Sequence, residues 1–391
     1  MRGVMINDVW IAGGAMTPFN RRKDGSSFRD WARVVVSGAL QDAGLEARDI
    51  DGLVVASESD FFTLQLNPSA LLADECGLAG VAAKRVEGGG ASGHVAVQAG
   101  VADVASGLAR RVMVIGLEPS ASHLAGLDVG ALYALSFDAW TDGMTGIDST
   151  SLYALSALAF MERTGARHED FARVAVRNRA HARHNPNAHL PLDISLGDVI
   201  ASPVVAPPYH RLDCSPLSDG AAAIILSCKA DLPQLSRRRT RFRATAGATD
   251  TVRLGERTDP GFFAGKRHAA DRAYKMADVT PSDIDLAEVY DSYSGAQLQA
   301  IEALKLAPNV LQADREGVFD AAGTLPVNLS GGLLGQGAPV GATGVAQIMT
   351  AAFQLEGRYV GQRPARTPKL ALVDTHGGIA TLNCVSILES P

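Results

Sequence analysis

The chain has 391 residues, of which 47% are apolar and 20% are charged, and its formal net charge is −6. These values are ordinary for a globular protein, the length is enough for two or three domains, and the acidic balance argues against nucleic acid or an anionic membrane as the main partner. Its 4 cysteines are scattered without a C-x-x-C pair, so the sequence predicts neither a disulfide framework nor a structural zinc site.

The N-terminal segment, residues 1–19, is typical of a strand followed by a loop. It lacks the apolar core of a signal peptide. No apolar run in the chain reaches the roughly 18 residues that a membrane helix needs. We therefore expect a cytoplasmic protein with no membrane partner.

Two stretches of the chain resemble each other in pattern and order. Residues 47–55, ARDIDGLVV, recur in outline as residues 281–290, PSDIDLAEVY, and each stretch follows a helical segment and ends in a strand that reads as buried. A second pair is Gly90-Ala-Ser-Gly93 and Gly341-Ala-Thr-Gly344, each leading into a small-residue helix and then a strand. The repeats predict two similar α/β halves, residues 1–240 and 241–391, with mostly parallel sheets covered by helices on both faces.

The segment from about residue 119 to residue 210 has no counterpart in the second half. Long excursions of this kind usually cover an active site and select the substrate. We therefore expect a loop domain inserted in the N-terminal half.

The glycine-rich stretch VEGGGASGH, residues 86–94, joins a strand-like run to a helix. Gly88, Gly90 and Gly93 satisfy G-x-G-x-x-G, which is the pattern of a dinucleotide-binding turn. The corresponding turn of the second half has only Gly-Ala-Thr-Gly, so a dinucleotide-binding oxidoreductase is a minor alternative.

Several motifs together resemble the thiolase superfamily, most of all its sterol-carrier-type (lipid-transfer-protein-like) and archaeal acetyl-CoA acetyltransferase branch. They are GGASGHVAVQAG, DCSPLSDGAAAIIL, EVYDSYSGAQLQAIEALKL, NLSGGLLGQGAPVGATGVAQ and DTHGGIATLNCVSIL. The resemblance implies an α/β thiolase fold of five layers, α-β-α-β-α, and a homodimer. It also implies an acyl-CoA substrate, with coenzyme A as part of that substrate and no separate cofactor.

The resemblance also locates the usual catalytic positions, and other residues occupy them here. The nucleophilic cysteine corresponds to Gly90, the histidine of G-H-P to Ala338, and the first residue of N-E-A-F or H-D-C-F to Tyr290. The second cysteine corresponds to Asp374, with His376 where a glycine is usual. Because thiolase chemistry needs a thiolate at the helix N-terminus, we do not expect covalent acyl transfer at Gly90.

A thiolase-like site without its cysteine could still make or break a carbon–carbon bond beside a thioester, in a retro-aldol or Claisen-type reaction. The lipid-transfer-protein-like aldolases of the superfamily carry a YDSF-like motif where this chain has Tyr290-Asp-Ser-Tyr293, although their second tyrosine has no equivalent in GQGAPVG. We predict Tyr290 as the acid/base, with Asp374 and His376 as its partners and a protonated His376 lowering the pKa of the phenol. The residues predicted to bind substrate or stabilise an oxyanion are Gly90, Ser92, Gly337, Ala338, Gly341, Gly377 and Gly378.

Two further alternatives remain open. One is an acyltransferase with a relocated nucleophile, and the other is a non-catalytic subunit of an acyl-CoA complex. Relatives in this branch often associate with a small zinc-ribbon/OB-fold protein, which makes such a partner subunit an expectation here. We predict no metal at His181, His184 and His189, a core position for His94, and a helix-capping role for Asp291 before SYSGAQLQAIEAL.

Overall fold

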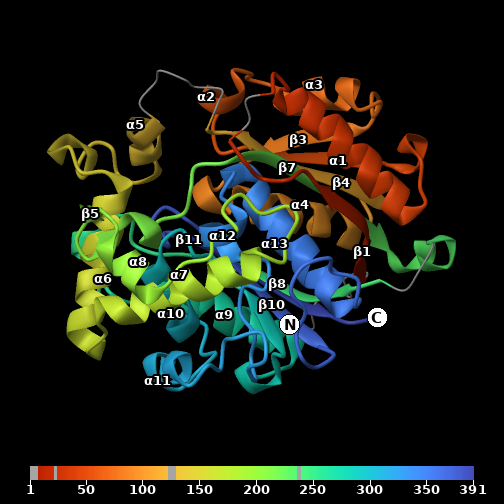
Figure 1. The fold of residues 1–391 in the computed structure, drawn as a ribbon. Helices are drawn as coiled ribbons and strands as arrows, with labels where there is room; N and C mark the ends of the chain where they lie inside the picture. Colours follow the sequence, from red (N-terminus) through yellow and green to blue (C-terminus); the bar gives the residue numbers. More distant parts are fainter. Residues whose placement is uncertain (1–7, 22–23, 122–128, 236–238) are drawn as a thin grey trace.

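The computed structural model describes residues 8–21, 24–121, 129–235 and 239–391, and their strands build one nine-stranded sheet and one small two-stranded sheet (Figure 1). The large sheet has the strand order β3-β2-β4-β7-β1-β8-β11-β10-β9. Its strands are β1 (Val9–Met16), β2 (Gly52–Ala56), β3 (Ala82–Val86), β4 (Arg111–Pro119), β7 (Asp219–Cys228), β8 (Arg241–Thr249), β9 (Leu286–Glu288), β10 (Leu370–Gly377) and β11 (Leu382–Glu389). The small sheet pairs β5 (Val204–Ala206) with β6 (Tyr209–His210).

The large sheet consists of two sub-sheets that meet at a single residue pair, Trp10 of β1 with Arg241 of β8. The N-terminal sub-sheet holds β3, β2, β4, β7 and β1, and the C-terminal sub-sheet holds β8, β11, β10 and β9. Only β2 with its two neighbours and β9 with β10 run parallel; the other paired strands are antiparallel. The prediction of mostly parallel sheets is therefore wrong. Residues 378–381 form a turn between β10 and β11 that is too short for a parallel crossover.

The helices complete five layers around these sub-sheets. Helix α1 (Phe28–Ala43) covers the outer face of the N-terminal sub-sheet, and α9 (Ala264–Ala277) covers the outer face of the C-terminal one. Helices α4 (Ser92–Ala105) and α13 (Val340–Leu355) pack against each other between the two sub-sheets, and nearly every residue of α13 is buried. The predicted α-β-α-β-α arrangement is confirmed.

The two repeated glycine motifs meet in the central layer. The backbones of α4 and α13 approach so closely that a Cβ atom on Gly344 would lie 2.3 Å from the backbone nitrogen of His94. The repeat seen in the sequence thus corresponds to the start of two helices that need small residues to pack side by side.

The remaining helices flank the layers. They are α2 (Asp60–Thr63), α3 (Pro68–Glu75), α5 (Val129–Tyr133), α6 (Ser149–Thr164), α7 (His168–Ala182), α8 (Leu196–Ala201), α10 (Ser294–Ala303), α11 (Val310–Arg315) and α12 (Gly332–Gln336). Helices α5 to α8 come from the predicted excursion and lie together at one side of the molecule, where α7 packs on α10 and α12 (Figure 1).

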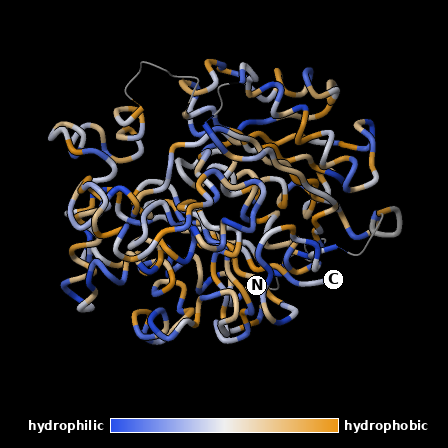
Figure 2. Tube along the Cα trace, viewed as in Figure 1, coloured by the Kyte–Doolittle hydropathy of each residue, from blue (hydrophilic) through white to orange (hydrophobic). Residues whose placement is uncertain are grey.

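Hydrophobic stretches run through the strands of both sub-sheets and through the central helices (Figure 2). Among the residues that the structure describes, no helix combines the length and the apolar character required to cross a membrane.

Candidate active site

The glycine turn lies between β3 and α4, with a short 3₁₀ turn over Gly89–Ala91. The Ser92 hydroxyl accepts a hydrogen bond from the Gly88 backbone N–H at 3.0 Å and donates one to the Gly89 carbonyl at 2.7 Å. Ser92 is fully buried and does not line the cavity described next, so the structure places it behind the turn, where it fixes the backbone.

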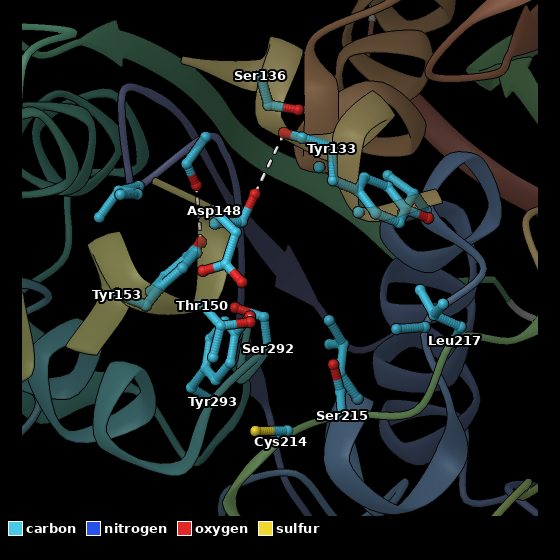
Figure 3. Close-up of a pocket in the computed structure, with 18 of the residues that line it drawn as sticks. Tyr133, Ser136, Asp148, Thr150, Tyr153, Cys214, Ser215, Leu217, Ser292 and Tyr293 are labelled. Atoms are coloured by element: carbon cyan, nitrogen blue, oxygen red, sulfur yellow. Dashed lines mark hydrogen bonds between the residues drawn. The ribbon is translucent and has the colours of Figure 1, made fainter. Parts of the chain in front are cut away.

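A cavity of about 350 Å³ opens beside this turn. Gly90, Tyr290 and His376 line one part of it, and side chains of the excursion line another. Figure 3 shows Tyr153 and Tyr293 close together on one wall, with ring centroids 4.6 Å apart. The cavity therefore brings together the N-terminal half, the C-terminal half and the excursion.

Tyr290, just after β9, fills the space in front of Gly90. A Cβ atom on Gly90 would lie 2.6 Å from the Tyr290 phenolic oxygen and 2.5 Å from the His376 carbonyl oxygen. No ordinary contact of a Cβ atom is so short, so a residue with a side chain does not fit at position 90 in this arrangement. The phenol hydroxyl occupies the place to which a side chain on the turn would point.

A buried ionic network supports His376 from behind. Lys266 of α9 donates to both carboxylate oxygens of Asp374, the Oδ2 contact being 2.6 Å, and its Nζ lies 3.0 Å from His376 Nδ1. Because an ammonium group can only donate, Nδ1 accepts and the ring proton sits on Nε2. Nε2 then donates to the Tyr153 hydroxyl at 2.8 Å, and that hydroxyl donates to the Gly378 carbonyl at 2.6 Å.

The electrostatics differ from the prediction for Tyr290. Burial, with Lys266 adding to it, lowers the pKa of His376 well below its ordinary value, so its imidazole is neutral at neutral pH. Burial raises the pKa of Tyr290 well above its ordinary value. The expectation that a protonated His376 lowers the Tyr290 pKa is therefore wrong, because burial and the positive charges of Lys266 and Arg257 disfavour the imidazolium. Tyr290 is a neutral hydrogen-bond donor whose ring packs on that of His376, with centroids 4.5 Å apart.

Asp374 and Lys266 are both fully buried. Burial raises the pKa of Asp374 and lowers that of Lys266, and their mutual attraction opposes both shifts. The Tyr290 backbone N–H also donates to Asp374 at 3.4 Å. Asp374 thus lies behind the cavity wall, in position to hold Lys266 and Tyr290 rather than to touch a substrate.

The cavity wall also holds a carboxyl group that was not predicted from the sequence, that of Glu58, which follows β2. Its Oε1 accepts a hydrogen bond from the Ser136 hydroxyl at 3.1 Å, whereas its Oε2 is buried and has no hydrogen-bond partner within the described ranges. Burial raises the pKa of Glu58 to about 7, and the nearby charge of Glu87 adds to this. A signal was present, since Glu58 stands at the carboxyl end of a parallel strand, where ligands of α/β sheets usually bind.

A second carboxyl group, Glu118 of β4, lies directly behind Glu58. It is fully buried, and it accepts hydrogen bonds from the Glu58 backbone N–H at 2.7 Å, the Gly341 N–H at 3.2 Å and the Ser57 hydroxyl at 3.0 Å. Burial and the Glu58 charge raise the Glu118 pKa to about 8. The Gly341 N–H, predicted as an oxyanion donor, is directed at this carboxyl group.

The other predicted binding residues lie around the same turn. Ala338 lines the cavity, and its N–H donates to the Ser218 hydroxyl at 3.1 Å, while Gly337 packs against the same hydroxyl. Gly377 and Gly378 line a second cavity of about 330 Å³ on the other side of the turn, and Gly378 lines both.

Three of the cysteines have raised pKa values. Cys214 lines the main cavity, and burial raises the pKa of its thiol to about 12. Cys384 lies buried in β11 with its pKa raised to about 12, and the Cys76 pKa is raised to about 11 at the end of α3. All three thiols are therefore protonated at neutral pH.

Three histidines outside the cavity have structural partners. His94 is fully buried and bonds the hydroxyls of Thr375 and Ser386, as expected for a core position. His181 bonds the Asn328 carbonyl and His189 the Ser218 hydroxyl. Over the described part of the chain, no three His, Cys, Asp or Glu side chains gather as they would around a metal ion.

Asp291 caps a helix, but not the predicted one. Its carboxylate accepts hydrogen bonds from the backbone N–H groups of Leu333, at 2.6 Å, and Leu334, at 3.3 Å, in the first turn of α12. Asn178 of α7 also donates to it at 2.6 Å. The chain folds back after Asp291, which brings α12 rather than α10 to the carboxylate.

Comparison with known proteins agrees with this architecture. The family described as thiolase, N-terminal domain, matches residues 9–195, and the one described as thiolase C-terminal domain-like matches residues 246–390. An acetyl-CoA acetyltransferase of Methanothermobacter thermautotrophicus is 36% identical over 98% of this chain and 100% of the relative. Human sterol carrier protein 2 is 28% identical over 94% of this chain and 69% of the relative. A solved structure described as Ltp2-ChsH2(DUF35) aldolase superposes with a TM-score of 0.83 and 28% identity, covering 99% of both chains. The glycine turn is thus part of a thiolase fold rather than of a dinucleotide-binding domain, and the chain belongs to the thiolase superfamily.

Proposed function

We propose that this protein makes or breaks a carbon–carbon bond next to the thioester of an acyl-CoA, in an aldol or retro-aldol reaction without a covalent acyl-enzyme. One observation carries the proposal: the Tyr290 hydroxyl occupies the space in front of Gly90, where a nucleophilic side chain would have to stand. The similarity to a solved aldolase supports it further.

Tyr290 acts in this reaction as a hydrogen-bond donor. In a retro-aldol step the β-hydroxyl loses its proton, the Cα–Cβ bond breaks, and the acyl-CoA is left as an enolate. A neutral phenol beside the thioester oxygen stabilises the negative charge that develops there. Its raised pKa keeps Tyr290 protonated and therefore able to donate.

The cavity suits an acyl group bulkier than acetyl. Its wall includes the rings of Tyr133, Phe137, Tyr153 and Tyr293 together with Leu217. Apolar and aromatic walls with few polar groups bind hydrophobic ligands and orient them through those few groups.

We also propose that the protein acts together with a partner subunit, on the basis of a similar solved structure. The aldolase structure is described as Ltp2-ChsH2(DUF35), and this pairing supports a partner subunit for this chain. The homodimer that the family resemblance implies stays a proposal. A partner of that kind would be added to the assay whenever the chain alone is inactive.

The test is incubation of the purified protein, alone and with any co-purifying small partner, with panels of 3-hydroxyacyl-CoA and 3-oxoacyl-CoA, read by mass spectrometry. We expect a hydroxyacyl-CoA to give a carbonyl compound and a shortened acyl-CoA. Tyr290→Phe should abolish this cleavage, whereas Tyr274→Phe, which removes a buried hydroxyl bonded to the Leu304 carbonyl outside the cavity, should retain it.

Other results would contradict the proposal in distinct ways. Turnover of oxoacyl-CoA with an acylated protein mass would indicate an acyltransferase with a relocated nucleophile, and Cys214 is the cysteine to map first because it lines the cavity. Absence of turnover with every substrate and partner would indicate a non-catalytic subunit.

A further inference from the structure

The proposed reaction needs a group that takes the proton from the β-hydroxyl, and Tyr290 cannot be that group. Its phenol is neutral, and burial holds its pKa well above the ordinary value. A base with an ionised form near neutral pH must therefore come from elsewhere in the cavity wall.

Two other candidates in the wall already have their polar atoms in use. His376 accepts from Lys266 with Nδ1 and donates to Tyr153 with Nε2, so it has no free ring nitrogen. Asp148 is exposed, and its carboxylate caps α6 by accepting the Ser151 N–H at 2.7 Å. Neither has a buried, unused acceptor.

Glu58 does have such an acceptor. Its Oε2 is buried without a hydrogen-bond partner among the described residues, while Oε1 is held by Ser136. The side chain lines both cavities, and its Oε1 would lie 3.9 Å from a Cβ atom on Gly89. The next residue of the turn, Gly90, faces the Tyr290 hydroxyl. The Glu58 carboxyl group and the Tyr290 phenol therefore lie beside two consecutive residues of the same turn.

We propose that Glu58 is the catalytic base of this site, taking the proton of the substrate β-hydroxyl and returning it to Cα of the acyl-CoA enolate. The proposal rests on the proposed function above. It assigns Glu58 the proton transfer and Tyr290 the stabilisation of the enolate oxygen.

The step balances without any co-reactant. The Glu58 carboxylate takes the hydroxyl proton, and the O–H electron pair forms the new C=O bond as Cα–Cβ breaks. The electrons of the broken bond form the enolate, whose Cα then takes the proton from the Glu58 carboxylic acid. The products are a carbonyl compound and a shortened acyl-CoA, and Glu58 is again a carboxylate.

The surroundings of Glu58 tune it for this exchange. Burial raises its pKa to about 7, so that both of its forms are populated near neutral pH. The charged and titratable groups near it, from the elements packed around it, are Asp60, Arg85, Glu87, Glu118, Tyr133, Tyr153 and Tyr290. Since the carboxylate is the active form in cleavage, kcat should rise as the pH increases through about 7.

The experiment compares the wild type with Glu58→Gln and with Glu87→Gln as matched control, because Glu87 is exposed and lines only the second cavity. The first readout is cleavage of 3-hydroxyacyl-CoA as a function of pH. We expect Glu58→Gln to lower kcat by ~10²–10⁴-fold and to remove the rise near pH 7, whereas Glu87→Gln keeps kcat and shifts the rise to slightly lower pH.

The second readout is deuterium uptake at Cα of the shortened acyl-CoA in D₂O, which reports enolate formation without the carbonyl product. We expect uptake with the wild type and Glu87→Gln and its loss in Glu58→Gln. If the wild type cleaves the substrate and Glu58→Gln retains kcat, the pH rise and Cα exchange, the assignment of Glu58 as the base is overturned, while the proposed function stands. Absence of cleavage and of exchange in the wild type would overturn the proposed function with it.

Discussion

Replacing Gly90 by alanine tests whether the site is closed to a side chain at the turn. The new Cβ would meet two atoms, the Tyr290 hydroxyl at 2.6 Å and the His376 carbonyl at 2.5 Å. The carbonyl cannot withdraw easily, because His376 belongs to β10 and is paired there with Asn383 of β11. Overpacking of this kind costs about 1–3 kcal/mol, and the lower entropy of the unfolded alanine chain returns about 0.4–1 kcal/mol, so we expect a net loss of roughly 1–2 kcal/mol in the free energy of unfolding.

The assay is urea unfolding, with Gly255→Ala as the control because nothing lies within 4 Å of a Cβ atom there. Gly255→Ala should lower the free energy of unfolding by less than about 0.5 kcal/mol. In a Tyr290→Ala background one of the two clashes is absent, so Gly90→Ala should cost about 0.5–1 kcal/mol less than in the wild type. A Gly90→Ala variant as stable as Gly255→Ala, with no coupling to position 290, would refute the reasoning.

Three further outcomes are expected. Lys266→Met should cost roughly 3–5 kcal/mol in urea unfolding because it leaves the buried Asp374 carboxylate unpaired, and adding Asp374→Leu should recover most of that loss. Cys214→Ser should keep acyl-CoA turnover within a few-fold, and the intact mass of the wild type should show no acyl adduct, because the thiol with a pKa of about 12 is protonated. The pKa of Glu58 is about 7 in the folded state and 4.5 in the unfolded chain, so the folded state holds this proton more tightly. The contribution of Glu58 to stability is therefore full below about pH 4.5 and is lost as the pH rises to about 7. Glu58→Gln should therefore gain stability relative to the wild type between pH 5 and pH 8, measured by urea unfolding at both.

The repeated motifs of the sequence predicted two similar α/β halves, and the family resemblance implied the five layers. Each glycine motif begins a helix whose small residues allow it to pack in the central layer. The alternation of strands and helices predicted mostly parallel strands, and this was wrong because β10 and β11 are joined by a short turn and β7 enters the sheet between β4 and β1. The place of β7 is decided by partners far from it in the chain, and the local pattern of one strand carries no information about its neighbour's direction.

The same distinction applies to the candidate site. Tyr290, Asp374 and His376 were located through the family resemblance, and the structure brings them together. Lys266 was missed because a lysine within GKRHAADRAYKMA is typical of the exposed face of an amphipathic helix. Only the packing of α9 on the C-terminal sub-sheet buries its side chain against Asp374, and that contact joins residues 108 positions apart.

The carboxyl groups of Glu58 and Glu118 bear on whether the protein is an enzyme or a non-catalytic subunit. Burial disfavours the charge on both, and the Oε2 atom of Glu58 lacks a partner within the described ranges, so the pair lowers the stability of the fold at neutral pH. Packing alone gives no reason for this arrangement, since a glutamine at position 58 could accept the single Ser136 hydrogen bond without a charge. Of the two, Glu58 lines the cavities, and a proton-transfer site requires a group of this kind because a base must present an unused acceptor to its substrate. A variant that gains stability while losing turnover would therefore separate the catalytic role of Glu58 from a structural one.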